Sequence, residues 1–477
     1  MPTAVSPGLD AESLEEFISR SWDDDIVPQL VDYIRIPCKS PHFDADWAAN
    51  GYMDAAVALA EQWSRAQDIP GLKIEVMRLE DRTPVIFFEL AGDAPGTVLM
   101  YGHLDKQPEM TGWRDELGPW KPVLHEGKLY GRGGADDGYA IFASLLALSA
   151  LKKQGVAHAR IVGLIECCEE SGSYDLPVYL DALRSRIGNV DLVIGLDSGC
   201  GNYEQLWMTT SLRGIAAGTL TVEVLNEGVH SGDASGVVPS SFRIARRLLD
   251  RIEDAITGRI LPKEFNCDIP AERIEQAALA GETLGDSMLT RFPFAGGTQP
   301  MTRVHGEAAL NRTWRPFLSI VGAEGLPAIN DAGNVLRPHT ALKLSLRIPP
   351  LVNGERATQD MKRILETDPP LGAKVTFEPD QAATGWHAPA TAPWLNDVVN
   401  AASKQFYGKP AMMMGEGGTI PFMAILGESF PKAQFLITGV LGPKSNAHGP
   451  NEFLHIPYAK KLTACVAQVI AGHAKRA

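Results

Sequence analysis

The chain has 477 residues, which is too long for one ordinary domain, so we expect two. Hydrophobic residues make up 45% of it and charged residues 21%, as is typical of a soluble globular protein. The formal net charge of −14 disfavours a nucleic-acid partner, because a strongly acidic protein repels a phosphate backbone.

The first part of the chain alternates between helical and strand patterns. Apolar residues at helical spacing predict a helix from 10 to 36, which Pro37 ends. This alternation predicts an α/β fold with a mostly parallel central sheet. The expected strands are 97–101, 160–165 and 191–196, and the expected helices are 138–153 and 175–187.

The pattern changes near Thr210 into the order strand, helix, strand, strand, helix, strand. This order is that of a ferredoxin-like domain, so we expect residues 210–382 to form an inserted α+β domain. Residues 1–209 and 383–477 would then form the other domain, which this segment interrupts. The expected elements are strands 215–224, 317–321, 340–348, 373–377 and 434–437, helices 240–253, 356–365, 394–406 and 458–473, and an irregular stretch at 257–314.

The cysteine pattern and the hydropathy of the chain indicate the cellular compartment of the protein. The six cysteines form no CxxC pair, which favours reduced thiols and a cytoplasmic protein. The acidic N-terminus has no apolar core, so we expect no secretory signal. No run of about 18 apolar residues is present, so we expect no membrane span.

Acids and imidazoles follow several of the predicted strands and precede one helix. Parallel strands deliver the residues at their carboxyl ends to one edge of a sheet, where ligands bind. Two neighbouring divalent cations need many carboxylate oxygens and some neutral imidazoles, and a further carboxylate can take a proton from water. The residues are His103 and Asp105 in GHLD, Asp136 and Asp137 in GRGGADDG, Glu169 and Glu170 in CCEESGS, Asp197 in GLDSG, and His448 in NAHGPNE.

Each cluster alone has a simpler interpretation. A His-x-Asp pair is usually a surface hydrogen-bonded pair, an Asp-Asp pair before a helix is often only an N-cap, and a Glu-Glu pair is usually solvated. The GRGG loop could suggest phosphate binding, but Asp136 stands where a third glycine would be, and an acid there repels phosphate. The convergence of five segments is what favours a metal site.

The motifs GHLD, YGRGGADD, EESGS, LDSG, GVHSG, GEGGTIP and NAHGPNE resemble, in this order, those of a dinuclear zinc peptidase family. That family contains carnosinases, non-specific dipeptidases, aminoacylase, acetylornithine deacetylase and glutamate carboxypeptidases. The likeness covers nearly the whole chain and is strongest to the carnosinase and dipeptidase branch. The chain departs from the DDKG often found there, because Gly138 stands in place of the lysine.

The resemblance implies two divalent metal ions per chain, zinc in the first place and manganese or cobalt as alternatives. Asp105 would support one imidazole as a carboxylate behind the ligands, and Glu169 would act as general base and then as acid. The Asp136–Asp137 peptide bond is often cis in this family. The implied metal ligands are His103, Asp136 as the bridge, Glu170, Asp197 and His448.

The resemblance also implies a homodimer, joined through an inserted domain that closes as a lid. His230 would polarise the scissile carbonyl from the partner subunit, although a loop histidine beside a turn is the simpler interpretation. Arg347 would hold the substrate carboxylate, with a strand-edge salt bridge as the alternative. Asn334 and Thr419 would add polar contacts.

The expected activity is therefore metal-dependent hydrolysis of an amide bond in a dipeptide or an N-acyl amino acid. An N-deacylase or carbamoylase acting on a non-peptide amide is the alternative on the same scaffold. A non-catalytic binding protein is a further alternative, but it should have lost at least one ligand or the base. The stretch around 257–315 could influence the choice of substrate.

Overall fold

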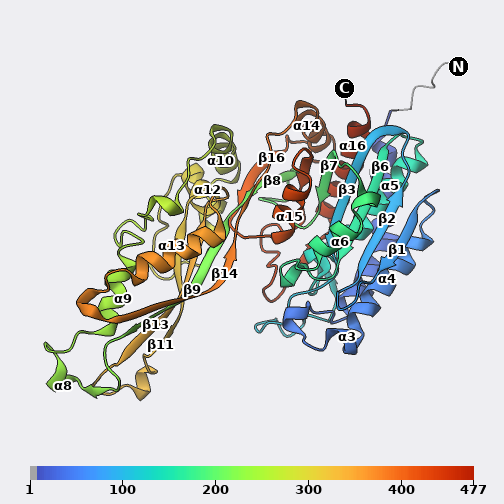
Figure 1. The fold of residues 1–477 in the computed structure, drawn as a ribbon. Coiled ribbons are helices and arrows are strands. Elements are labelled where there is room, and N and C mark those ends of the chain that lie inside the picture. The colour runs from blue at the N-terminus through green and yellow to red at the C-terminus, as the bar shows by residue number, and fades with distance from the viewer. Residues whose placement is uncertain (1–7, 477) are drawn as a thin grey trace. The chain divides into compact units, whose positions relative to one another are not determined.

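The computed structural model describes residues 8–476, so the part of the signal-peptide expectation that concerns residues 1–7 lies outside it. The described chain divides into two compact units (Figure 1). Within the described residues, the first unit consists of 8–210, Ala388–Met413 and 421–476, and the second of Ser211–His387 and Met414–Ile420. None of the described helices is both long and apolar enough to span a membrane.

A six-stranded sheet in the order β1-β2-β6-β3-β7-β17 forms the centre of the first unit. The pairs β6–β3, β3–β7 and β7–β17 are parallel, whereas β1–β2 and β2–β6 are antiparallel. The mostly parallel sheet expected from the sequence is thus confirmed. The strands are β1 (Lys73–Met77), β2 (Val85–Leu90), β3 (Ala94–His103), β6 (Ala159–Glu166), β7 (Leu192–Gly195) and β17 (Gln434–Ile437).

The inner strands of this sheet are buried because helices cover them. Helix α5 is apolar on nearly all sides and contacts both β3 and α16. Tyr101 of β3 stacks on Phe422 of α15 with ring centroids 3.8 Å apart. The helices are α1 (Ala11–Ser21), α2 (Val27–Ile34), α3 (Trp47–Asn50), α4 (Tyr52–Ala66), α5 (Tyr139–Lys153), α6 (Leu176–Ala182), α7 (Arg184–Ile187), α14 (Pro393–Tyr407), α15 (Pro421–Ser429) and α16 (Ile456–Ala474).

The helix expected at 10–36 is divided by one π-helical turn, η1 (Trp22–Ile26). Pro28 has no N–H group to donate to Asp24, so the regular hydrogen-bond pattern fails at this point. The helix expected at 175–187 likewise forms two pieces, α6 and α7.

Three smaller sheets complete the strands. The sheet β15-β8-β16 contains positions at which the chain passes between the two units. The sheet β18-β5-β4 belongs to the first unit, and the pair β10–β12 to the second. Their bounds are β4 (Val123–His125), β5 (Lys128–Tyr130), β8 (Trp207–Leu212), β10 (Val229–His230), β12 (Val335–Leu336), β15 (Trp386–His387), β16 (Met412–Glu416) and β18 (Phe453–His455).

The second unit contains an antiparallel sheet in the order β11-β13-β9-β14. Helices α9 and α13 connect its strands in the order βαββαβ, and they share one apolar core with the sheet. The ferredoxin-like arrangement expected here is therefore observed. The elements are β9 (Gly214–Glu223), α8 (Ser231–Ala234), α9 (Ser241–Leu249), β11 (Phe317–Glu324), β13 (His339–Ile348), α13 (Gly354–Glu366) and β14 (Lys374–Ala383).

The expectation of an irregular stretch at 257–314 was wrong, because it contains α10 (Ala271–Leu284), α11 (Ser287–Thr290) and α12 (His305–Thr313). Helices α10 and α12 approach closely where Gly281 of α10 faces Gly306 of α12. The buried side of α10 carries alanine and glycine, which give only a weak apolar periodicity.

Replacing Gly281 with alanine should lower the free energy of unfolding by about 1–3 kcal/mol. Its Cβ would lie 2.5 Å from the backbone N of Gly306 and 2.6 Å from the carbonyl C of His305, and backbone atoms cannot turn aside. Urea denaturation measures the change. The control is Gly297→Ala, because nothing lies within 4 Å of a Cβ there. Equal stability of the two variants would refute the close helix contact.

Candidate metal centre

The five polar segments predicted to converge do lie together at one edge of the first unit's sheet. His103 ends β3, Asp136 lies in the turn η3 (Gly134–Gly138) before α5, and Glu169 begins η4 (Glu169–Ser171) just beyond β6. Asp197 follows β7, and His448 lies in the loop before β18. Because β3, β6 and β7 run parallel, their carboxyl ends meet at this edge. The Asp136–Asp137 peptide bond is cis.

Asp136 lies between the two histidines, with one oxygen turned toward each. Its Oδ1 is 3.5 Å from Nε2 of His103, and its Oδ2 is 3.1 Å from Nε2 of His448. Asp197 Oδ2 is 3.8 Å from the same nitrogen of His103, and Glu170 Oε2 is 3.3 Å from that of His448. The side chains therefore form two groups that share one carboxylate.

Glu169 is a third carboxylate beside His103. One potential ligand atom from each of Glu169, His103 and Asp197 lies within 4.8 Å of the others. Burial raises the pKa of Glu169 well above its ordinary value, and the charge of Asp197 raises it further. A carboxyl group in this state can hold a proton near neutral pH, as a general acid must.

Asp105 connects two of the segments. Its Oδ1 lies 3.4 Å from Nδ1 of His103, and that same nitrogen lies 3.0 Å from the Asp105 backbone oxygen. The two carboxylate oxygens also accept the backbone N–H groups of Glu169 and Glu170, at 3.1 and 2.9 Å. One buried side chain thus orients an imidazole and fixes the neighbouring pair of glutamates.

Three supporting residues were not singled out from the sequence. Gln107 donates to Glu170 Oε2 at 2.6 Å and so orients that carboxylate. Arg132 and Glu452 form a fully buried ion pair at 2.5 Å, and Arg132 also donates to the backbone oxygen of His448 at 3.2 Å. The pair ties the loop that carries His448 to the glycine-rich loop that carries Asp136. The sequence feature that could have indicated the ion pair is a charged residue within each motif, Arg132 in GRGG and Glu452 in GPNE.

Gly138, which stands in place of the family's lysine, has no room for a side chain. A Cβ there would lie 2.1 Å from Cε1 of Tyr33. Lys106 supplies a buried ammonium nearby, and it donates at 2.8 Å to the backbone oxygens of Tyr33 and Ile36. Burial lowers the pKa of Lys106 to about 8.

The titrating groups of this edge compete for protons. Burial would raise the pKa of Asp136, but the imidazoles of His103 and His448 beside its two oxygens hold it far below its ordinary value. Burial would lower the pKa of His448, but the hydrogen bond with Asp136 raises it to about 9. Burial and the charge of Asp136 raise the pKa of Glu170 to about 8. Protons therefore provide the positive charge that this cluster of acids requires.

The residues fit a divalent metal site. Nε2 of His103 is buried and has no hydrogen-bond partner among the described residues, although it faces Asp136 and Asp197. Imidazole nitrogens and carboxylate oxygens are ligands of zinc and of similar divalent ions. A bridging carboxylate with an oxygen turned toward each imidazole suits a pair of cations.

The substrate-binding residues expected from the resemblance lie in the second unit, at opposite ends of its sheet. His230 pairs with Val335, and the backbone oxygen of Asn334 accepts the N–H of Ser231, just before β13 begins. Arg347 lies eight residues into β13, which corresponds to about 26 Å along a strand. It donates to Thr419 Oγ1 at 3.2 Å. One subunit therefore cannot bring all four residues to one small substrate.

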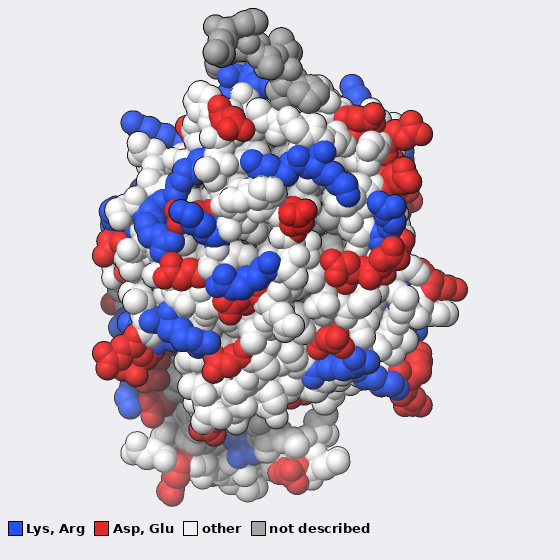
Figure 2. Space-filling model, turned by 90° about the vertical axis from the view of Figure 1, so that its right-hand side faces the viewer, with Lys and Arg blue, Asp and Glu red and all other residues white. Residues whose placement is uncertain are grey.

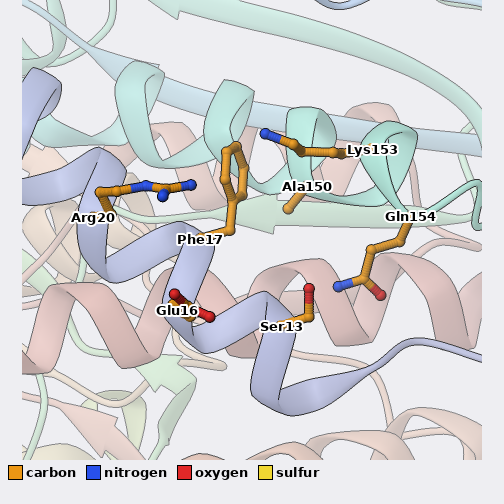
Figure 3. Close-up of a pocket in the computed structure, with 7 residues that line it drawn as sticks. All are labelled: Ser13, Glu16, Phe17, Arg20, Ala150, Lys153 and Gln154. Carbon is orange, nitrogen blue, oxygen red and sulfur yellow. The ribbon is translucent and has the colours of Figure 1, made fainter.

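A surface hollow elsewhere on the first unit carries no comparable chemistry. It lies between α1 and the end of α5, and Lys153 covers the Phe17 ring there at 4.3 Å (Figure 3). Charges of both signs are interspersed over the face of the first unit shown in Figure 2. That face has no extended basic area of the kind that nucleic acids require.

Known peptidases are similar to this chain in sequence. The model of peptidase family M20/M25/M40 matches residues 99–472. The cysteinylglycine-S-conjugate dipeptidase of Corynebacterium striatum is 27% identical, over 84% of this chain and 88% of its own. The beta-Ala-His dipeptidase of Homo sapiens is 26% identical, over 74% of this chain and 70% of its own.

Solved structures share the fold. Human carnosine dipeptidase 1 superposes with a TM-score of 0.75 at 22% identity, covering 99% of this chain and 100% of the other. The dipeptidase Dug1p of Saccharomyces cerevisiae gives a TM-score of 0.73 at 22% identity, covering 98% and 100%.

Zinc binding to this site should release protons and strengthen as pH rises from about 6 to 9. The metal needs neutral imidazoles and ionised carboxylates, whereas the raised pKa values of His448 and Glu170 keep them protonated at lower pH. Calorimetric titration in buffers of different ionisation enthalpy measures the proton release. Asp136→Asn should remove most of the affinity, and tight binding that is independent of pH would contradict the prediction.

Proposed function

We propose that this chain, which belongs to peptidase family M20/M25/M40, hydrolyses the amide bond of a dipeptide or an N-acyl amino acid in a metal-dependent reaction. The observation that carries the proposal is Asp136, which presents one carboxylate oxygen to His103 and the other to His448. The relatives named as dipeptidases support the substrate class.

Two divalent ions, zinc in the first place, would bind at this edge. His103 and Asp197 would hold one, Glu170 and His448 the other, and Asp136 both. Bound there, they would lower the pKa of a water molecule and polarise the substrate carbonyl. With three carboxylates and two neutral imidazoles the ligand set carries about three negative charges, which nearly balances two divalent cations. Manganese and cobalt suit the same ligands.

Glu169 would transfer the proton. Its buried carboxylate takes a proton from the attacking water and later gives it to the leaving amine. The raised pKa of Glu169, caused first by burial, allows it to carry that proton between the two steps. Asp105 fixes the backbone of Glu169 and so positions the base.

His230 would stabilise the carbonyl oxygen during attack. Its Nδ1 accepts the N–H of Gly232 at 3.1 Å, so the neutral ring carries its proton on Nε2 and can donate it outward. Because His230 on β10 lies near the start of β13 and Arg347 near its end, we infer a homodimer through the second unit, in which His230 and Asn334 serve the partner's site.

Arg347 and Thr419 would bind the substrate carboxylate. Arg347 is half-buried, and burial lowers its pKa, with no neighbouring acid acting against this. A guanidinium in this state gains from an anionic ligand, which it can hold with two parallel hydrogen bonds. The carboxylate would belong to the residue that leaves as the amine.

A cytoplasmic location is part of this proposal. The six cysteines are not joined in disulfides in the described chain, and five of them are buried. Free thiols are typical of a reducing compartment.

Glu169→Gln should lower kcat for dipeptides by about 10²–10⁴-fold while elemental analysis still finds metal. Asp136→Asn should instead lose the metal, because it removes the shared ligand. Glu15→Gln, an exposed change on α1, is the matched control and should keep the wild-type rate. Chelation should abolish cleavage, and added zinc should restore it. A near-normal rate of Glu169→Gln would exclude it as the base.

Mixing two inactive variants tests the shared site. A dimer of Glu169→Gln with His230→Ala has one site with both defects and one with neither. Random reassembly should therefore restore about a quarter of the wild-type activity. Size-exclusion chromatography with light scattering confirms the dimer. If the mixture stays inactive although mixed dimers form, His230 does not act across the interface.

A further inference from the structure

Three arginines of the second unit surround the loop of residues 416–419. Arg213 lies between β8 and β9, Arg312 near the end of α12, and Arg347 on β13. A Cβ on Gly417 would lie 2.9 Å from the backbone oxygen of Arg312, 3.1 Å from Nη2 of Arg213 and 3.4 Å from Cγ of Arg312. A glycine therefore lets the loop pack against the backbone of Arg312, and this brings it next to the side chains of Arg213 and Arg312.

Hydrogen bonds fix the guanidinium of Arg213 through two of its three nitrogens, Nε and Nη1. Its side chain is 91% buried, and it donates from Nε to the oxygen of Gly417 and from Nη1 to those of Asn311 and Arg315. Its own backbone oxygen accepts the hydroxyl of Thr419 at 2.7 Å. Nη2 makes no hydrogen bond within the described chain. Arg213 therefore fixes the carboxylate-binding loop and keeps an unused donor beside it.

Arg312 is a cation without a direct partner. Its guanidinium forms no hydrogen bond and no ion pair with the described residues. Burial lowers its pKa to about 10, Arg291 adds to this, and the charge of Glu416 opposes it only partly. Burial likewise lowers the pKa of Arg213 to about 10, and the charges of Arg347 and Arg312 lower it further.

This concentration of positive charge exceeds what one substrate carboxylate would neutralise. Three guanidinium groups lie around a single loop, and Glu416 is the only acid that acts on any of them directly among the described residues near the loop. Partly buried like charges are costly unless an anion joins them. One carboxylate on Arg347 and Thr419 would leave Arg312 and Nη2 of Arg213 unmatched.

We propose that Arg312 and Nη2 of Arg213 form a second anion-binding position beside Arg347 and Thr419. The preferred substrates would then carry two carboxylates in the residue that leaves as the amine, which makes this residue a C-terminal aspartate or glutamate. Arg347 and Thr419 hold its α-carboxylate, and Arg312 with Arg213 holds its side-chain carboxylate. This substrate class rests on the amide hydrolysis proposed above.

Matched dipeptide pairs test this preference. The metal-loaded enzyme should cleave Ala-Glu over Ala-Gln, and Ala-Asp over Ala-Asn, by about ten- to a hundredfold in kcat/KM. Arg312→Gln should reduce each ratio to within about threefold, mainly by lowering the rate for the acidic member of each pair. Arg312→Lys, which keeps the charge, should retain part of the preference and shows that the effect is not one of folding.

Arg315→Gln is the matched control. It removes the same charge three residues away, but its guanidinium is already paired with Glu307 at 2.6 Å, so the preference should persist. Equal wild-type rates for the acid and amide pairs would overturn the proposal. So would an equal loss of both rates in Arg312→Gln.

A binding measurement separates this proposal from the proposed function. Calorimetric titration with N-acetyl-glutamate and with N-acetyl-glutamine reports the anion position even if no dipeptide is cleaved. Tighter binding of the acid, lost in Arg312→Gln, supports the position whatever the catalytic result. Equal binding of both probes refutes it. Absence of chelator-sensitive cleavage of every dipeptide refutes only the hydrolytic function.

Discussion

The crowding of buried carboxylates around Asp136 is the constraint on which the rest of the catalytic unit depends. Acids this close together repel one another and are costly to bury unless positive charge compensates them. In the metal-free chain, protons on His103 and His448 supply part of that charge. Divalent cations bound between these imidazoles and carboxylates would supply more positive charge than the protons do. The parallel sheet is what permits such crowding, because it brings several chain segments to one edge while its strands stay buried.

Two buried interactions keep that edge in register. Asp105 joins the end of β3 to the glutamate pair that follows β6, and the Arg132–Glu452 pair joins the two loops that carry Asp136 and His448. Neither interaction needs to touch a substrate. Breaking the buried Arg132–Glu452 pair would leave one charge uncompensated and lower the free energy of unfolding by about 3–5 kcal/mol. The loss would displace the loops that carry Asp136 and His448 rather than a single side chain. The carboxylates and imidazoles at this edge are therefore positioned by buried charged side chains that are themselves paired.

The sequence predicted the elements whose patterns are strong, and the polar residues that follow them. Strands β3, β6 and β7 are continuous apolar runs, so the side chains after them could be placed at one edge before any coordinates were known. Helices α10 and α12 were not predicted because alanine and glycine form their contact, and these small residues give only a weak apolar periodicity. The distance between His230 and Arg347 could not be anticipated either, since it depends on the register of β13 against its neighbours. Arg213 and Arg312 gave no motif, and only the packing around Gly417 brings them together.

The two units collect opposite charges, and this separates reactivity from specificity. The edge of the first unit holds an excess of carboxylates and so attracts cations, whereas the loop of residues 416–419 in the second is surrounded by guanidinium groups and attracts anions. Under the proposed function, a substrate with both an amide carbonyl and carboxylates would match the charge of each unit, whereas a neutral amide would match only that of the first. Under the proposed function, changes at Arg312 would alter which amide is chosen without disturbing a metal ligand, and changes at Asp136 would stop hydrolysis of every amide alike. Selectivity of this kind adjusts binding energy at a place remote from the scissile bond.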